Sequence, residues 1–293
     1  MIWLIKPVVI FSLIISMFIV LPTYCQNTES IVTFSDQQFE RGNYELAVNE
    51  YNRAIFFGNP NTDAICLKVA SCYINLNKPA LSAMFFDRAY FSARSDSIKT
   101  EAILGKSFSL ILDKQYLLAI SELLNLDSAK ITEQNIRLNF LKGIAYFGLN
   151  EDKPAEIAFK KCILEAAGKN YLNDIENEFK LISKTEKRYN PHTAWILSLI
   201  VPGIGQAYAG KYKEAANSAI LLGGIIYLAT TFAVKYTALE AIVIILPWFQ
   251  RYYIGGANKA EKLTLEKQME KRNDSYQTIL NRIEAEGQKK LIN

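Results

Sequence analysis

The C-terminal third of the chain contains long apolar runs separated by short polar breaks. Residues 215–234 read AANSAILLGGIIYLATTFAV and include no charged residue. About 20 helical residues cross about 30 Å of hydrocarbon, so the run predicts a membrane-spanning helix at 215–235. A second run at 238–254 predicts a second span, although it contains Glu240, Pro247 and Arg251. Only residues 235–237 separate the runs, which favours an antiparallel helical hairpin.

A shorter apolar segment at 193–209 precedes the hairpin and is interrupted at Pro202-Gly203. Proline removes an amide donor and glycine permits unusual dihedral angles, so we expect a broken half-helix with a sharp bend at this point. Such a bend is tolerated at membrane depth when neighbouring groups bond the freed backbone, and Gln206 is a candidate donor. Residues 191–257 are therefore interpreted as a membrane domain.

The number of crossings stays open at this stage. With two spans, the basic residues before and after the hairpin lie on the same side of the membrane. An N-terminal export signal would make that side periplasmic. Basic residues next to membrane spans tend to stay cytoplasmic, which argues against this orientation. A third, short crossing at 192–209 would instead leave the C-terminal tail in the cytoplasm.

The tail at 258–293 alternates charged residues with apolar ones. The apolar positions are Leu265, Met269, Tyr276, Leu280 and Ile283. This spacing predicts an amphipathic helix that follows the membrane domain after Gly255-Gly256 and serves as a packing or self-association surface.

Small and aromatic residues recur with a period of about 34 residues between residue 27 and about residue 164. In the first unit Gly42-Asn43-Tyr44 precedes Ala47, Tyr51 and Ala54. The matching positions in later units are Ala70, Tyr73, Phe86 and Ala89, then Gly105, Phe108, Tyr116, Ala119 and Leu123, then Gly143, Tyr146, Ala155, Phe159 and Cys162. These residues resemble tetratricopeptide repeats. The third unit departs from the pattern by one inserted residue.

The resemblance implies an all-α fold, with a solenoid of helical hairpins at 26–190 followed by the transmembrane hairpin and the amphipathic helix. Stacked helix pairs form a concave groove that suits a protein or peptide partner. In that family the first helix of each pair lines the groove. The candidate contact residues are Gln37, Gln38, Arg41, Lys68, Lys106, Asn139 and Lys142.

The segment around the Pro-Gly bend is similar to an uncharacterised bacterial membrane domain with the pattern Ser-Leu-x-x-Pro-Gly-x-Gly-Gln-x-Tyr-x-Gly and two following apolar helices. The matching residues are Ser198, Pro202, Gly203, Gly205, Gln206, Tyr208 and Gly210. The resemblance implies no established activity. In the first span, Ala215, Ala219 and Gly223 recur every four residues and form a strip of small side chains suited to close helix packing, such as a homo-oligomer contact.

Residues 1–25 have one basic residue, Lys6, and an apolar core before Pro22, which is typical of a secretory signal peptide. We expect a protein of the bacterial inner membrane with the repeats in the periplasm. An uncleaved N-terminal anchor and a lipoprotein modified at Cys25 are the alternatives.

Composition narrows the classes of function. The net charge is only +4 and basic residues are interleaved with acidic ones, so no nucleic-acid partner is expected. Cys66, Cys72 and Cys162 fall where helices need small apolar side chains, and the single histidine, His192, has no ligand partners at metal-binding spacing. No catalytic set and no cofactor site can be assembled. The chain is interpreted as a non-enzymatic, membrane-anchored interaction scaffold; the alternative is a small oligomeric transport or assembly element whose active part is the Pro202-Gly203 membrane domain.

Overall fold

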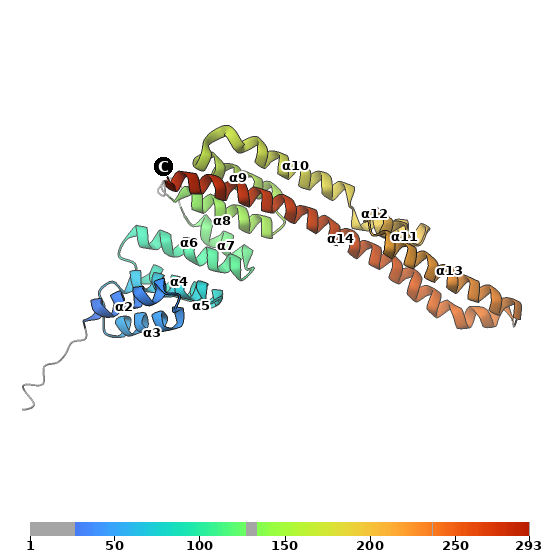
Figure 1. Cartoon of the computed structure of the whole chain (residues 1–293), viewed down its shortest axis with the longest axis horizontal. Coiled ribbons are helices and arrows are strands. Elements are labelled where there is room, and N and C mark those ends of the chain that lie inside the picture. Colours follow the sequence, from blue (N-terminus) through green and yellow to red (C-terminus); the bar gives the residue numbers. More distant parts are fainter. Residues whose placement is uncertain (1–26, 127–133, 236, 293) are drawn as a thin grey trace, which may run out of the picture. The chain divides into compact units, whose positions relative to one another are not determined.

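The computed structural model describes residues 27–126, 134–235 and 237–292, and within these ranges the secondary structure is entirely helical (Figure 1). Residue contacts divide the chain into two compact units, residues 1–131 and 132–293. The boundary falls inside the segment 26–190 that was expected to form one repeat domain. The expected signal peptide at 1–25, including Cys25, lies outside the described residues.

Residues 27–126 of the first unit form three helix pairs, and each pair also packs against the next pair along the chain. The helices are α2 (Thr28–Glu40), α3 (Tyr44–Phe56), α4 (Thr62–Asn75), α5 (Pro79–Ser92), α6 (Asp96–Leu112) and α7 (Tyr116–Leu124). Asn27 begins the first of them, because its side-chain oxygen accepts from the amides of Glu29 and Ser30.

The turn inside each helix pair contains a residue in the left-handed region of backbone space. These residues are Gly42, Asn77, Lys114 and, in the second unit, Asn150, with φ of 80°, 54°, 59° and 62°. They recur about every 36 residues, as expected of one supersecondary unit repeated along the chain. Glycine and asparagine adopt this conformation most readily, so Lys114 is the exception among the four.

The small residues of the predicted repeat pattern lie where helices cross. Ala47, Ala54, Ala70 and Ala89 are fully buried, and Tyr51 is 1% exposed. Gly105 on α6 faces the ring of Phe86 on α5 so closely that a Cβ atom would come within 2.3 Å of it. A larger side chain at position 105 would require the Phe86 ring to move from its place in the core.

The second unit begins with a fourth helix pair and ends with a long helix that returns to it. Its elements are α8 (Asn135–Gly148), α9 (Asp152–Ala167), the 3₁₀ helix η2 (Gly168–Tyr171), α10 (Leu172–Arg188), α11 (Pro191–Ile200), α12 (Ile204–Tyr208), α13 (Tyr212–Lys235) and α14 (Ala238–Ile292). A new helix begins soon after α10 ends: Pro191 is in the first turn of α11, and Asn190 caps that helix by accepting from the amide of Thr193.

The expected helix break at Gly255-Gly256 is wrong, because α14 runs without interruption from Ala238 to Ile292. The second apolar run and the tail at 258–293 are therefore one helix. A Cβ atom on Gly256 would come within 3.1 Å of Ser218 Oγ on α13. This glycine marks a close approach between two helices rather than the end of one.

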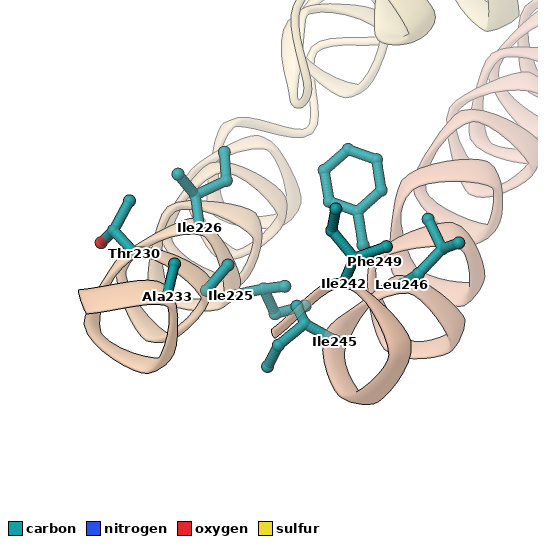
Figure 2. Close-up of a pocket in the computed structure, with 9 residues that line it drawn as sticks. Ile225, Ile226, Thr230, Ala233, Ile242, Ile245, Leu246 and Phe249 are labelled. Atoms are coloured by element: carbon teal, nitrogen blue, oxygen red, sulfur yellow. The ribbon is translucent and has the colours of Figure 1, made fainter. Parts of the chain in front are cut away.

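The hairpin of α13 and α14 exposes most of its apolar surface. Among the described residues, α13 is the one helix long and apolar enough to cross a membrane, and only 6% of its most apolar stretch is buried. The first turns of α14 expose Leu239, Ile242, Val243, Ile244 and Leu246. Figure 2 shows the two helices near their connection, where Ile225 and Ala233 on α13 and Ile245 and Phe249 on α14 line a crevice of about 370 Å³.

Candidate functional site

The Pro-Gly motif forms a sharp turn between α11 and α12. Val201, Pro202 and Gly203 connect the two helices, so the missing amide hydrogen of Pro202 falls outside a helix, where it breaks no helical hydrogen bond. Gly203 has φ of +97°, and a Cβ atom there would lie 2.6 Å from the backbone oxygen of Ala215. Both the backbone conformation and the contact with α13 therefore require glycine.

Gln206 connects three helices through its side chain. It is fully buried; Ser198 Oγ on α11 donates to its Oε1 over 3.1 Å, and its Nε2 donates to the backbone oxygen of Gly256 on α14 over 2.8 Å. Ser198 Oγ also accepts from the amide of Gly205 over 3.1 Å. A buried amide side chain is stable only with such partners, so the polar residues of the motif satisfy one another inside an apolar environment.

Tyr208 brings the end of α12 back to the start of α11. Its hydroxyl donates to the backbone oxygen of Arg188 and accepts from the amide of Asn190 over 3.1 Å. Gly205 packs against α11 as well, since a Cβ atom there would lie 2.1 Å from the backbone oxygen of Ala194. The segment α11–α12 thus folds back on itself, and its two ends lie together.

Gly210 ends this fold-back and allows α13 to begin. It has φ of +78°, and the amide of Lys211 donates to the backbone oxygen of Gln206 over 2.9 Å. This arrangement is typical of a helix that ends at a left-handed glycine. The seven motif residues therefore all lie in the turn between α11 and α12 or in the contacts that this segment makes with α13 and α14.

In the first unit, the partly exposed Lys68 side chain is bound by Asp36. Its Nζ donates to both carboxylate oxygens of Asp36 over 2.7 and 2.8 Å, and it lies 5.9 Å from the centre of the Tyr51 ring. The Tyr51 hydroxyl also donates to Asp36. Burial, followed by the hydrogen bond to Asp36, raises the pKa of Tyr51 well above its usual range, so the phenol stays protonated.

Lys106 has a similar position one repeat later. Its Nζ lies 2.7 Å from Asp87 on α5 and 2.8 Å from Glu122 on α7. Burial opposes the charged form, but the hydrogen bonds to both carboxylates outweigh it and raise the pKa of Lys106. The ammonium therefore stays charged while it connects three successive helices.

A pocket of about 250 Å³ opens beside Lys106, and sequence reasoning missed most of its lining. The missed residues include Phe86, Tyr90, Phe91 and Asn125. Phe91 is 83% exposed, which is unusual for a phenylalanine and forms an aromatic rim next to charged side chains. The adjacent pair Tyr90-Phe91 at the end of a helix was the available signal.

The other predicted groove residues differ in accessibility. Gln37 on α2 and Arg41 just after that helix are exposed, whereas Gln38 and Asn139 are only 5% and 8% exposed. The prediction of a contact surface is wrong for Gln38 and Asn139, because both side chains are buried. Gln38 instead accepts a hydrogen bond from Asn43 Nδ2 over 2.9 Å at the turn.

Lys142, on α8 in the second unit, is half-buried. Burial, and then the neighbouring Lys161, lower the pKa of its ammonium. Asn139 and Lys142 belong to the second unit, whereas the other five predicted groove residues belong to the first.

The strip of small residues on α13 is open in the single chain. Ala219 and Gly223 are exposed, Ala215 is partly exposed, and nothing lies within 4 Å of a Cβ built at Gly223. The strip therefore stays a candidate contact for a second copy.

The C-terminal half of α14 packs against the fourth helix pair. Arg272 lies 3.6 Å from the centre of the Phe147 ring, donates to the backbone oxygen of that residue and pairs with Asp152 over 2.8 Å. One turn later the ring of Tyr276 stacks on Phe147 at 4.3 Å. Ile279 is 1% exposed in the same cluster, so the tail serves as a packing surface that completes this core.

Comparison with known families matches residues 187–289 to one described as "Family of unknown function (DUF5683)". The match begins near the end of α10 and covers α11, α12, α13 and most of α14, about a third of the chain. No curated protein and no solved structure matches the chain. The matched residues include the Pro-Gly turn and the helices that pack around it.

Proposed function

We propose that the chain is a non-enzymatic membrane-anchored scaffold, in which a hairpin of α13 and α14 is embedded in the bilayer and tetratricopeptide-like helix pairs bind a protein or peptide partner. The exposed apolar surface of α13 is the observation that carries this proposal. A helix of 24 residues with so little of its apolar stretch buried is unfavourable in water and suited to lipid.

Helix α14 supports the coupling of the two functions. Its first turns pair with α13, and its last turns share a core with α8, α9 and α10. One uninterrupted helix therefore connects the membrane hairpin to a helix pair of the repeat type. Such a helix couples the position of the helix pair α8–α9 to that of the hairpin without a flexible linker.

The pocket beside Lys106 is the proposed partner site. An exposed aromatic side chain, Phe91, and the ammonium of Lys106 both line this pocket, and aromatic residues are enriched at binding surfaces. Two acidic groups, Asp87 and Glu122, already neutralise the lysine. We therefore propose a partner segment that inserts an apolar side chain, rather than one recognised by its charge.

The expected location is the bacterial inner membrane with the repeats on the periplasmic side. The fold-back of α11–α12 favours two crossings over three, because its ends lie together at Tyr208 and Arg188. With two crossings, α10 and the C-terminal half of α14 are on the same side of the membrane.

The alternative, in which the membrane domain is the active transport or assembly element, has less support. The residues around the Pro-Gly bend have partners within the chain, and Ser198 and Gln206 are buried. This arrangement favours an architectural role for the motif.

Photo-crosslinking from two equally exposed phenylalanines tests the proposal. Phe91 and Phe56 are both 83% exposed in the first unit, but only Phe91 lines the pocket. With a benzophenone amino acid at either position of the full chain in native membranes, we expect a discrete adduct from position 91 and none from position 56. Identical patterns from the two positions, or recovery of the chain in the soluble fraction, would contradict the proposal.

A further inference from the structure

We propose that α11–α12 is a re-entrant element that inserts its turn into the acyl layer of one leaflet, while basic residues around its base bind anionic phospholipid head groups. The inference rests on the proposed embedding of the α13–α14 hairpin. It adds the kind of lipid surface that the membrane domain recognises and the residues that recognise it.

The length of α11 excludes a full crossing. Its 10 residues rise about 15 Å, half of the roughly 30 Å hydrocarbon thickness. The chain then turns at Gly203 and returns, so that Tyr208 contacts Arg188 and Asn190 at the starting end. Non-helical backbone at membrane depth requires internal partners, and Ser198 and Gln206 supply them here.

Hydrogen bonds to α14 fix the depth of the turn relative to the hairpin. At the base, Trp195 Nε1 donates to Asn258 over 3.0 Å, and the next residue, Lys259, pairs with Glu214 on α13. Near the turn, Tyr253 donates to the backbone oxygen of Leu199. From Lys259 to Tyr253 is about 9 Å along α14, so the turn reaches about a third of the way into the apolar layer that begins at Ala215.

The turn exposes apolar side chains in the direction of the lipid. Ile196, Ile200, Val201 and Ile204 are all exposed, and Ile200 is the most exposed at 71%. No described helix covers them. Four exposed aliphatic residues on so short a segment would be unfavourable in water, whereas an acyl layer at this depth removes them from it.

Basic residues surround the base of the same element. Exposed lysine and arginine side chains occur at Lys187, Arg188, Lys211, Lys213, Lys259 and Lys262. The acidic residues near them in the sequence are Glu186, Glu214, Glu261 and Glu266. Glu214 pairs with Lys259, and Glu266 lies 4.0 Å from Lys262. Lys211 and Lys213 directly follow α12 and flank Tyr212, which is 74% exposed.

This arrangement fits the interface of an anionic leaflet. Basic residues next to a membrane segment are attracted to anionic lipid, and exposed tyrosine is suited to the head-group layer. The other end of the hairpin has only Lys235 before its connection and Glu240 after it, and Glu240 accepts from the amide of Thr237. Between the two ends, the apolar part of α14 contains one exposed cation, Arg251. The larger group of basic residues is at the end where α11–α12 lies.

Nitroxide depth measurements on the full chain test the insertion. The label is placed by Ile200→Cys, Lys211→Cys or Ile226→Cys, with Cys25→Ser in each, in nanodiscs of phosphatidylcholine and phosphatidylglycerol. We expect Ile200→Cys to be accessible to oxygen but not to a water-soluble nickel reagent, Lys211→Cys to show the reverse, and Ile226→Cys to lie deeper than Ile200→Cys.

The outcomes separate the two proposals. If Ile226→Cys is in lipid but Ile200→Cys is in water, the re-entrant insertion is wrong and the anchor stands. If both are in water, the membrane anchor itself is wrong. A label at Ile200→Cys that is shielded from both reagents would mean that a second copy or another protein covers the turn, which also overturns the inference.

Lipid selectivity tests the basic surface. The ratio of phosphatidylglycerol to phosphatidylcholine retained by the purified chain is measured by native mass spectrometry for the wild type and for Lys211→Gln with Lys213→Gln. A contribution of about 1 kcal/mol per lysine predicts a loss of about fivefold for each lysine removed. Lys153→Gln with Lys169→Gln, exposed residues of the fourth helix pair and the following 3₁₀ helix, should leave the ratio unchanged. Equal ratios in all three proteins would overturn the head-group assignment.

Discussion

Gln206 donates a hydrogen bond to the backbone oxygen of Gly256 over 2.8 Å, across 50 residues of sequence. The bond connects the short helix after the Pro-Gly turn to the middle of the longest helix in the second unit. Gly256 also faces α13, where Ser218 Oγ would lie 3.1 Å from a Cβ atom built at this glycine. One amide side chain therefore joins the fold-back to the hairpin.

Replacing Gln206 by leucine should destabilise the second unit. The substitution leaves Ser198 Oγ and the oxygen of Gly256 without their buried partner, and an unsatisfied buried polar group costs about 1–3 kcal/mol. Thermal unfolding of the full chain in nanodiscs should show a lower Tm. Asn217→Leu, an exposed substitution on α13, is the control and should leave Tm almost unchanged. Equal effects of the two substitutions would contradict the role assigned to Gln206.

Arg272 and Arg282 provide a matched pair for the attachment of α14 to the helix pair α8–α9 and to α10. The side chain of Arg272 is 14% exposed and contacts Phe147 and Asp152, whereas that of Arg282 is 43% exposed and pairs with Asp174 over 3.2 Å. We expect Arg272→Gln to lower the free energy of unfolding by about 1–3 kcal/mol, since it removes a charge-assisted hydrogen bond and a cation–π contact. Arg282→Gln should cost less than about 1 kcal/mol.

Hydrogen exchange of α8 and α9 is the measurement that distinguishes these variants. Arg272→Gln should increase exchange in both helices, because α14 loses its contacts with Phe147 on α8 and Asp152 on α9. The interpretation fails if Arg282→Gln causes the larger increase.

The helix pairs could be predicted because small residues at crossings leave a periodic signal in the sequence. Ala47, Ala54 and Ala89 are where the pattern put them. The break at Pro202-Gly203 was also predictable. Proline restricts the backbone conformation and glycine widens it, and both effects are local and independent of the rest of the fold.

The features that were missed depend on contacts distant in sequence. Gly256 resembles a helix end locally, and only its contacts with Gln206 and Ser218 explain a glycine inside α14. Gln38 and Asn139 are polar residues on predicted groove helices, yet tertiary packing buries them. The fold-back of α11–α12 likewise depends on Tyr208 reaching Arg188, which no periodicity encodes.

The three buried thiols predict a specific dependence on pH. Cys66, Cys72 and Cys162 are fully buried and free. Burial raises the pKa of Cys72 and of Cys162 to about 12, and it raises that of Cys66 in the same direction. An unfolded cysteine has a pKa near 8.5, so the unfolded chain releases protons first as pH rises. The contribution of these thiols to stability is therefore complete below about pH 8.5 and is lost progressively toward pH 12.

Alkylation kinetics check this prediction in a Cys25→Ser chain. At about pH 8.5, iodoacetamide should modify the three thiols slowly in the folded protein and rapidly in denaturant, because the thiolate is the reactive form. Fast modification of Cys162 in the folded chain would show that the fourth helix pair opens readily and would contradict the burial argument.

The strip of Ala215, Ala219 and Gly223 predicts how α13 would associate with a second copy. Nothing lies within 4 Å of a Cβ built at Gly223 or at the adjacent Gly224, so a leucine at either position is tolerated in the single chain. Only Gly223 belongs to the strip, and close packing of membrane helices needs small residues at the contact. If the strip forms a homo-oligomer, Gly223→Leu should weaken association in lipid by several fold while Gly224→Leu should not. Energy transfer between labelled copies at increasing lipid dilution measures this difference, and equal association of the wild type and Gly223→Leu would exclude the strip as the contact.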